Sequence, residues 1–295
     1  RETKGGIGDM LSLSVALAAL KQKTRCTITV ECKGDQDGPR MQTLRRCEGV
    51  DRAVAESKEP PVHDVMVDLS EGASRGELAE LRSTGRIKSC RAELYCKALQ
   101  IDPPASLAAR LRLTGADVGL ARSAMRNAGL RKGFVALVMR SAEAYKDWSS
   151  ESWAQLAGLL SERRVLFTRI GPDSDIDEQA LGIGGFAALL ARAGCVVSTD
   201  TLAMHLAGAL GVPGVALFGP SDGRRIKYPS VASIQAGTPC SPCWRYAQTR
   251  CALIPAELDR SKCMEDLRPE QVCEAVVFQM EQARKARQAH AGASL

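Results

Sequence analysis

The sequence predicts an α/β protein made of two doubly wound, Rossmann-like domains that face a central cleft. Short β-branched runs alternate with longer segments whose apolar residues recur at helical spacing, which is typical of βα units on a parallel sheet. The chain has 295 residues, enough for two domains that each bury a core. Apolar residues make up 45% and charged residues 25%, the profile of a globular protein.

The composition of the chain indicates which kinds of partner and which cellular compartment fit this protein. The formal net charge of +6, from 40 basic and 34 acidic residues, is compatible with phosphate-rich substrates or an anionic membrane surface. Aromatic residues are only 4%, which argues against a nucleic-acid binder built on stacking platforms. No apolar run reaches the length of a transmembrane helix. The odd count of eleven cysteines does not resemble a secreted disulfide framework, so we expect a cytoplasmic protein with reduced thiols.

The first domain is expected to span residues 1–130. A helix over 11–21 follows a glycine-rich turn, and strands are predicted at 26–32 and 65–69. Residues 72–118 are expected to be mostly helical, and a polar, helix-like segment follows over 114–132. Because the chain begins almost at the glycine turn, we expect the first strand of this domain to be missing.

The second domain is expected to span residues 131–268, followed by a C-terminal helix and polar tail over 269–295. Since doubly wound domains bind ligands at the carboxyl ends of their strands, we expect the functional residues on the loops that follow them. The last helix starts with Pro at its first turn and carries Val272, Val276, Val277 and Met280 on one face. The predicted strands are 134–139, 165–168, 195–198 and 215–218, and the predicted helices are 151–162, 186–193 and 202–210.

The stretch 199–219 carries the strongest signal. Asp200 stands where the N-cap of helix 202–210 belongs, and Thr201 and His205, four residues apart, share one face of its first turns. The unpaired amides of a helix start attract phosphate. The residues alone fit two interpretations equally well: a phosphate site, or a cap at Asp200 with a histidine packed on the sheet.

This stretch resembles the carboxyl-terminal signature of glycosyltransferase family 9, the ADP-heptose:lipopolysaccharide heptosyltransferases. The chain departs from the signature at Leu202-Ala203, where the family has Gly-Pro. The resemblance implies the two-domain GT-B fold, with Asp200, Thr201 and His205 as contacts of the diphosphate and ribose of the donor. The matching residues are Asp200, Thr201, His205, Leu206, Ala207, Ala209, Leu210, Gly211, Pro213 and Phe218-Gly219-Pro220.

The glycine turn at residues 4–10 (KGGIGDM) resembles the amino-terminal motif of the same family. The resemblance implies that Asp9 is the general base, which takes the proton of the acceptor hydroxyl in an inverting transfer. It also gives Gly8 a weaker role in donor binding. The residues alone also fit a tight turn with an acidic residue that favours the helix dipole.

The loop after strand 134–139 resembles a family loop through Ser141, Lys146 and Trp148. The resemblance implies that Ser141 and Lys146 bind the donor. The lysine would neutralise phosphate charge in place of a metal ion, so no cofactor is expected for catalysis. An ordinary exposed lysine is the alternative. Asp173, after the next strand, is a weaker candidate for donor binding.

Four cysteines, Cys240, Cys243, Cys251 and Cys263, form a cluster in the sequence. Their number and the Cys-x2-Cys start are compatible with a structural zinc site or, less well, with an iron–sulfur cluster. Unligated thiols are an alternative, as are disulfides if the protein leaves the cytoplasm. The family has a similar cysteine-rich stretch, and residues 263–272 match its ending.

The resemblance implies an inverting glycosyltransferase that moves heptose from an ADP-heptose-like nucleotide sugar to a lipopolysaccharide-type saccharide. It would act at the cytoplasmic face of the inner membrane, with peripheral membrane contact and no nucleic-acid partner. Two alternatives come from other classes. One is a non-catalytic nucleotide-sugar-binding or interaction protein of the same fold, and the other is a regulatory module built on the four cysteines.

Overall fold

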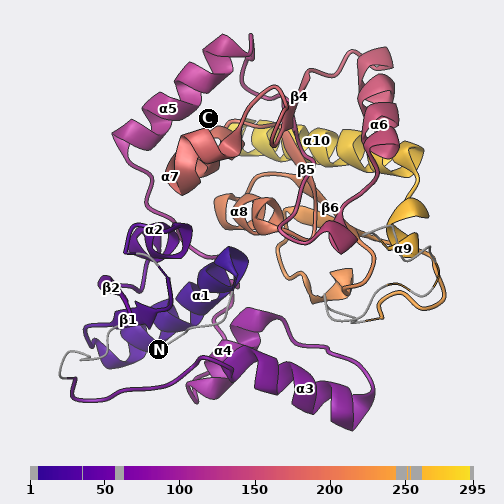
Figure 1. Cartoon of the computed structure of the whole chain (residues 1–295). Coiled ribbons are helices and arrows are strands. Elements are labelled where there is room, and N and C mark those ends of the chain that lie inside the picture. Colours follow the sequence, from indigo (N-terminus) through magenta and orange to yellow (C-terminus); the bar gives the residue numbers. More distant parts are fainter. Residues whose placement is uncertain are drawn as a thin grey trace. The chain divides into compact units, whose positions relative to one another are not determined.

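The computed structural model describes residues 6–34, 36–56, 63–243, 251, 253 and 261–292. The chain divides into two compact units, residues 1–115 with 182–184, and residues 116–181 with 185–295. Figure 1 shows the elements of both. In chain order these are α1 (Ile7–Thr24), β1 (Thr29–Cys32), α2 (Pro39–Arg46), β2 (Arg52–Ala55), α3 (Gly72–Thr84), α4 (Arg91–Ala98), α5 (Gly115–Asn127), β3 (Val135–Val138), η1 (Ala144–Lys146), α6 (Ser150–Glu162), β4 (Phe167–Ile170), α7 (Glu178–Leu190), β5 (Cys195–Thr199), α8 (Leu202–Leu210), β6 (Gly214–Phe218), η2 (Gly223–Arg225), β7 (Val231–Gln235), α9 (Lys262–Glu265) and α10 (Pro269–Gly292).

Helix α1 forms the centre of the first unit. Its residues 10–17 are all buried, and it packs against α2 and α4. The two serines in this buried run keep their hydroxyls paired inside the helix, as when Ser14 Oγ donates to the Leu11 carbonyl at 2.7 Å. The turn before β2 touches the helix at Gly49, whose φ is +89° and where a Cβ would lie 2.4 Å from the Ala18 nitrogen. Only glycine fits there.

The described strands of the first unit, β1 and β2, pair in parallel, with Thr29 opposite Arg52. The strand predicted at 65–69 is wrong, because these residues run without strand pairing. The side chains of Val65, Met66 and Val67 are 78%, 53% and 43% exposed. A short apolar run forms a strand only when its backbone also finds a partner strand, and here it does not.

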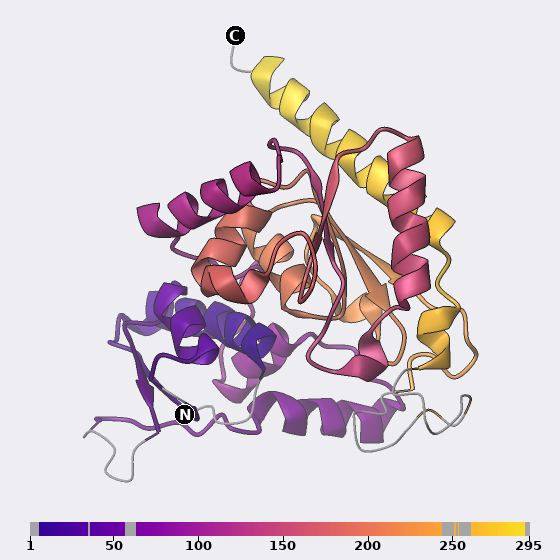
Figure 2. The ribbon, with the colours of Figure 1, turned by 45° about the horizontal axis from the view of Figure 1, so that its top comes forward.

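The second unit is built on a five-stranded parallel sheet in the order β4-β3-β5-β6-β7. Val135 and Leu137 of β3 point into a core that α6 and α10 cover. On the other face, Ala216 and Phe218 of β6 pack against Met204 of α8. Figures 1 and 2 show α6 and α10 along one side of the sheet and α8 along the other. Helices on both faces explain why every residue of β3, β5 and β6 is buried.

Most elements expected in the second unit are confirmed. The structure has strands at all four predicted places, and α8 has the predicted bounds 202–210. Val272 and Val276 of α10 are fully buried, as their spacing predicts. Strand β7 was not predicted. Helix α5, which the expected domain boundary near residue 130 assigns to the first domain, belongs to the second unit.

The strand order places a topological switch point between β3 and β5. From β3 the chain continues to the edge strand β4 and then returns to β5 on the other side of β3. The loops that follow β3 and β5 therefore leave the sheet side by side, which is where open parallel sheets bind their ligands. No described helix is long and apolar enough to cross a membrane.

Candidate functional site

The switch point brings Lys146 and Asp200 together. Lys146 follows β3 and Asp200 follows β5, and Lys146 Nζ lies 3.3 Å from Asp200 Oδ2. The same ammonium lies 3.0 Å from Glu143 Oε2. Ser221, on the loop after β6, donates its hydroxyl to Asp200 Oδ2 at 2.8 Å. Loops after three neighbouring strands thus share one polar cluster, Glu143, Lys146, Asp200 and Ser221.

Opposite charges hold both members of the central pair ionised. Burial by itself raises the pKa of Asp200, but the charge of Lys146 and the hydrogen bond from Ser221 outweigh burial and keep it below its ordinary value. Burial also works to lower the pKa of Lys146, and the charges of Asp200 and Glu143 hold it above its ordinary value. The site therefore presents a half-buried cation whose charge is fixed across the physiological pH range.

Asp200 is not the helix cap, so the interpretation of this residue as a capping side chain is wrong. Thr201 occupies the N-cap position of α8, with φ −144° and ψ 177°, and its side chain makes no capping hydrogen bond. The Asp200 carboxylate instead accepts from Ser221 and pairs with Lys146. The amides at the start of α8 therefore receive no capping bond from the Thr201 side chain, which leaves the helix N-terminus suited to an anion.

His205 lies one turn into α8 and is bonded to Tyr228. His205 Nδ1 and Tyr228 Oη are 2.9 Å apart, and the two rings meet edge to face. Tyr228 packs on Gly208, where a Cβ would lie 2.3 Å from the tyrosine ring. The tyrosine hydroxyl thus fixes the orientation of the imidazole, and glycine at position 208 makes room for the tyrosine.

Ser141 stabilises the loop after β3. Its backbone N–H donates to Asp147 Oδ1 at 2.7 Å, and its hydroxyl donates to the Glu143 carbonyl at 2.7 Å. Trp148 ends the loop in the core, where Nε1 donates to the Leu267 carbonyl at 3.2 Å. These bonds fix the backbone on both sides of Lys146.

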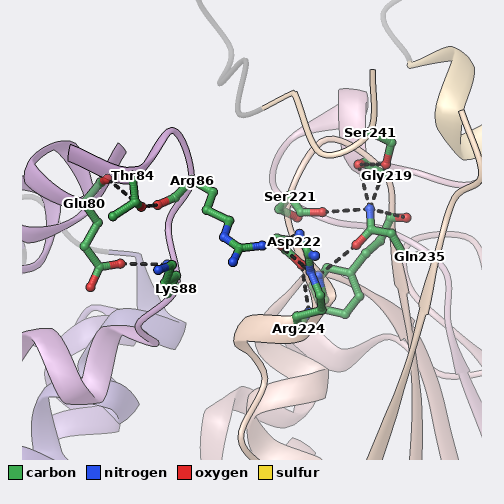
Figure 3. Close-up of polar contacts among 12 residues, drawn as sticks. Glu80, Thr84, Arg86, Lys88, Gly219, Ser221, Asp222, Arg224, Gln235 and Ser241 are labelled. Carbon is green, nitrogen blue, oxygen red and sulfur yellow. Dashed lines mark hydrogen bonds and ion pairs between the residues drawn. The ribbon is translucent and has the colours of Figure 1, made fainter. Parts of the chain in front are cut away.

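Gln235 organises the loop after β6, as Figure 3 shows. Its Nε2 donates to the carbonyls of Gly219 and Ser221, both at 3.1 Å, and its Oε1 accepts from the Gly223 N–H at 2.9 Å. Gly219 also lies against α9, since a Cβ there would meet Cys263 Sγ at 2.7 Å. This loop carries Ser221, so Gln235 supports the partner of Asp200.

Two further residues, Asp173 and Gly8, are weaker predicted contacts of the donor. Asp173 is exposed, with φ +56°, after the edge strand β4. Within the described ranges, no hydrogen bond or ion pair joins it to Lys146 or Asp200. Gly8 lies in the first turn of α1, and its carbonyl accepts from Ser12 Oγ at 3.3 Å. Their roles in donor binding stay predictions.

Asp9 belongs to the first unit and lies in the first turn of α1. Its Oδ2 accepts from the Gly6 N–H at 2.6 Å, and its Oδ1 lies 2.7 Å from Arg91 Nη1. The first contact satisfies an amide at the helix start, as the alternative interpretation of this residue expects. The second contact holds the carboxylate beside a cation.

The four clustered cysteines differ in exposure, from exposed Cys240 to buried Cys263. Burial, and then the neighbouring thiols of Cys243, Cys251 and Cys240, raise the pKa of Cys263 to about 12. None of the eleven cysteines, all of which lie in described positions, forms a disulfide. Among the described side chains, no three His, Cys, Asp or Glu residues are placed to hold a metal ion.

Sequence reasoning missed several members of the site. Glu143 could have been found, because it lies three residues before Lys146 on the same loop. Ser221 directly follows the Phe218-Gly219-Pro220 motif, which is a weaker signal. Tyr228 and Gln235 carry no local signal, since their roles depend on contacts 23 and 14 residues away in the chain.

Comparisons with a family model and with a curated protein both find similarity to heptosyltransferases. A model described as glycosyltransferase family 9 (heptosyltransferase) matches residues 108–252. The chain is 27% identical, over 196 residues, to lipopolysaccharide heptosyltransferase 1 of Pseudomonas aeruginosa. This match covers 61% of the chain and 52% of the relative, so the chain spans about half the length of this curated relative.

Solved structures share the fold. The family 9 glycosyltransferase of Veillonella parvula superposes with a TM-score of 0.65 at 15% identity, over 95% of this chain and 96% of that one. ADP-heptose lipopolysaccharide heptosyltransferase II of E. coli superposes with a TM-score of 0.57 at 15% identity, over 96% of this chain and 98% of that one. The iron-containing dodecameric glycosyltransferase TibC of enterotoxigenic E. coli superposes with a TM-score of 0.62 at 16% identity, over 96% of this chain and 77% of that one. These likenesses confirm the predicted α/β fold of GT-B type.

Proposed function

We propose that this chain is a member of glycosyltransferase family 9 and an inverting transferase that moves heptose, or a closely related sugar, from a nucleotide-sugar donor. The proposed acceptor is a lipopolysaccharide-type saccharide. The donor is ADP-heptose or a sugar nucleotide like it. The names of the relatives support this choice, because the family model and two of the matched proteins are described as heptosyltransferases.

The observation that carries the proposal is the Lys146–Asp200 pair at the switch point of the second unit. A nucleoside diphosphate needs a cation and a set of amide donors, and the protein offers Lys146 and the start of α8 on neighbouring loops. When the donor binds, its phosphate oxygens take the place of Asp200 as partners of the Lys146 ammonium. Thr201 and His205, on the first turns of α8, orient the diphosphate and the ribose.

In the proposed reaction, Asp9 accepts the proton of the acceptor hydroxyl. The acceptor oxygen forms a bond to the anomeric carbon, on the face opposite to the diphosphate. The bond from that carbon to the diphosphate oxygen breaks, and its electron pair leaves with the nucleoside diphosphate. Lys146 neutralises the charge that develops on this leaving group. Donor phosphate charge is met by this lysine, so the reaction we propose assigns no step to a metal.

A transfer assay tests this function. The protein is mixed with ADP-heptose and a panel of lipopolysaccharide core saccharides, and mass spectrometry detects a product heavier by one heptose. Asp9→Asn should abolish the product while nucleotide binding persists. Transfer that survives in Asp9→Asn would remove Asp9 as the base. Binding of the donor without any transfer would contradict the proposed activity.

We further propose that Cys240, Cys243, Cys251 and Cys263 hold a structural metal, zinc first. The chemistry of four thiolates suits tetrahedral zinc or iron. Besides burial, the other three thiols raise the pKa of Cys263, which supports their closeness to it. All four cysteines are described, and no three of them are placed to hold an ion as they stand. Elemental analysis of purified protein tests the idea, and iron is measured in parallel because TibC is described as iron-containing. Absence of both metals from freshly purified protein would overturn it.

The proposed place of action is the cytoplasmic face of the inner membrane, with peripheral contact. The formal charge of +6 supports contact with an anionic surface. Sedimentation with vesicles of anionic and of neutral lipid tests this, and equal recovery with both would contradict it.

A further inference from the structure

One arginine joins three helices of the first unit. Arg91 is the first residue of α4, and its Nη1 lies 2.7 Å from Asp9 Oδ1 on α1. Its Nε and Nη2 donate to Oε1 and Oε2 of Glu77 on α3, each at 3.1 Å. The side chains of Arg91, Glu77 and Asp9 are 27%, 7% and 19% exposed. A single guanidinium thus bridges two carboxylates in a largely buried place.

The two carboxylates contact the guanidinium differently. Glu77 makes a bidentate contact and is the more deeply buried of the two, so it is the fixed end of the bridge. Asp9 receives a single contact from Nη1. One cation therefore faces two anions, and Asp9 is oriented without being fully neutralised.

Further bonds fix both ends of this bridge. Asp9 Oδ2 accepts from the Gly6 N–H at 2.6 Å, so the carboxylate is held through both oxygens. The start of α4 is held by Glu93, whose Oε2 accepts from the Cys90 N–H at 2.8 Å. Just before it, Glu80 Oε2 accepts from the Lys88 N–H at 2.7 Å, as Figure 3 shows. Arg91 therefore projects from a fixed piece of backbone.

We propose that Arg91 is a positioning residue for Asp9 and that Glu77 holds Arg91 in place. This rests on the proposed function, in which Asp9 is the general base. Arg91 itself neither gives nor takes a proton. It sets the direction of the Asp9 oxygen that receives the acceptor hydroxyl proton, and a misdirected base slows the chemical step while donor binding is unchanged.

Steady-state kinetics on three variants test this. Arg91→Ala should lower kcat about 10- to 100-fold with the donor KM within about twofold of wild type, because only the orientation of the base is lost. Methylguanidinium added to Arg91→Ala should restore part of kcat, since it can occupy the space left between the two carboxylates. Glu77→Gln should lower kcat by a smaller factor. Arg75→Ala, which removes an exposed arginine of α3 paired with Glu71, is the matched control and should leave kcat unchanged.

Four results separate this inference from the function on which it rests. Wild-type kcat in a folded, nucleotide-binding Arg91→Ala overturns the positioning role, as does a loss of kcat that methylguanidinium does not restore. If Arg91→Ala does not fold, Glu77→Gln decides, and an unchanged kcat in that variant also overturns the role. Retained transfer in Asp9→Asn instead overturns the proposed base, whatever Arg91→Ala does.

Discussion

Lys146 Nζ lies 3.3 Å from Asp200 Oδ2, so the cation expected to meet donor phosphate is already paired with a carboxylate from the neighbouring loop. Lys146→Ala removes this charge. Hydrogen bonds to charged groups contribute about 1.5–3 kcal/mol, so affinity for ADP should fall about 10- to 100-fold in calorimetric titration. Lys132→Ala, at an exposed position, is the control. An affinity within twofold of wild type in Lys146→Ala would exclude a phosphate-binding role.

The lowered pKa of Asp200 gives a pH dependence of stability. Because the pKa is lower in the folded than in the unfolded protein, the ionised carboxylate stabilises the fold above its unfolded pKa of about 3.9. This contribution is lost as the pH falls through that value toward the folded pKa. The test is urea unfolding of wild type and Asp200→Asn at steps between pH 7 and pH 3. The difference in their free energies of unfolding should be constant above pH 5 and should become smaller in acid. A difference that does not change with pH would contradict the assigned ion pair.

Tyr228→Phe tests the support of His205. The change removes the hydroxyl that lies 2.9 Å from His205 Nδ1 and keeps the ring that packs on Gly208. A single neutral hydrogen bond contributes about 0.5–1.5 kcal/mol, so donor affinity should fall about 2- to 10-fold with little change in melting temperature. The measurement is a titration with the donor alongside a thermal melt. Undiminished affinity would show that the imidazole does not depend on this bond.

Gly208→Ala tests the close packing of α8 on Tyr228. A Cβ at this position would lie 2.3 Å from the tyrosine ring, and displacing the ring should cost about 1–3 kcal/mol of unfolding free energy. Gly158→Ala in α6 is the matched control, because within 4 Å the added Cβ meets no described atom other than those of its chain neighbours and its own helix backbone. That variant should be neutral or more stable by up to about 1 kcal/mol, since alanine favours helix. Equal effects of the two substitutions would contradict the described packing.

Local sequence predicted those parts of the fold that local chemistry decides. Helix α8 lies between two clear signals, the polar residues after a buried strand and Gly211, whose φ is +64°. By contrast, residues 65–69 have the composition of a strand, but a strand also needs a partner, and a local pattern does not reveal one. The edge strand β7, which is only partly buried, was missed because it lacks the continuous apolar run of the central strands.

The sequence allowed prediction of those site residues whose positions follow from the order of the strands in the sheet. Placing Lys146 and Asp200 after strands of one parallel sheet predicts that they share an edge, and the pairing of β3 with β5 brings them into contact. The role of Ser221 depends on the neighbouring position of β6. The Asp9–Arg91–Glu77 bridge lay beyond sequence reasoning, because it depends on how α1, α3 and α4 pack.

The most direct test of the donor site is a crystal structure of the protein with ADP or ADP-heptose bound. We expect the diphosphate to lie at the switch point, with a phosphate oxygen within hydrogen-bonding distance of Lys146 Nζ and of the amides at the start of α8. His205 should contact the nucleotide. A nucleotide bound elsewhere, with the Lys146–Asp200 pair intact and its surroundings empty, would show that the switch point is not the donor site.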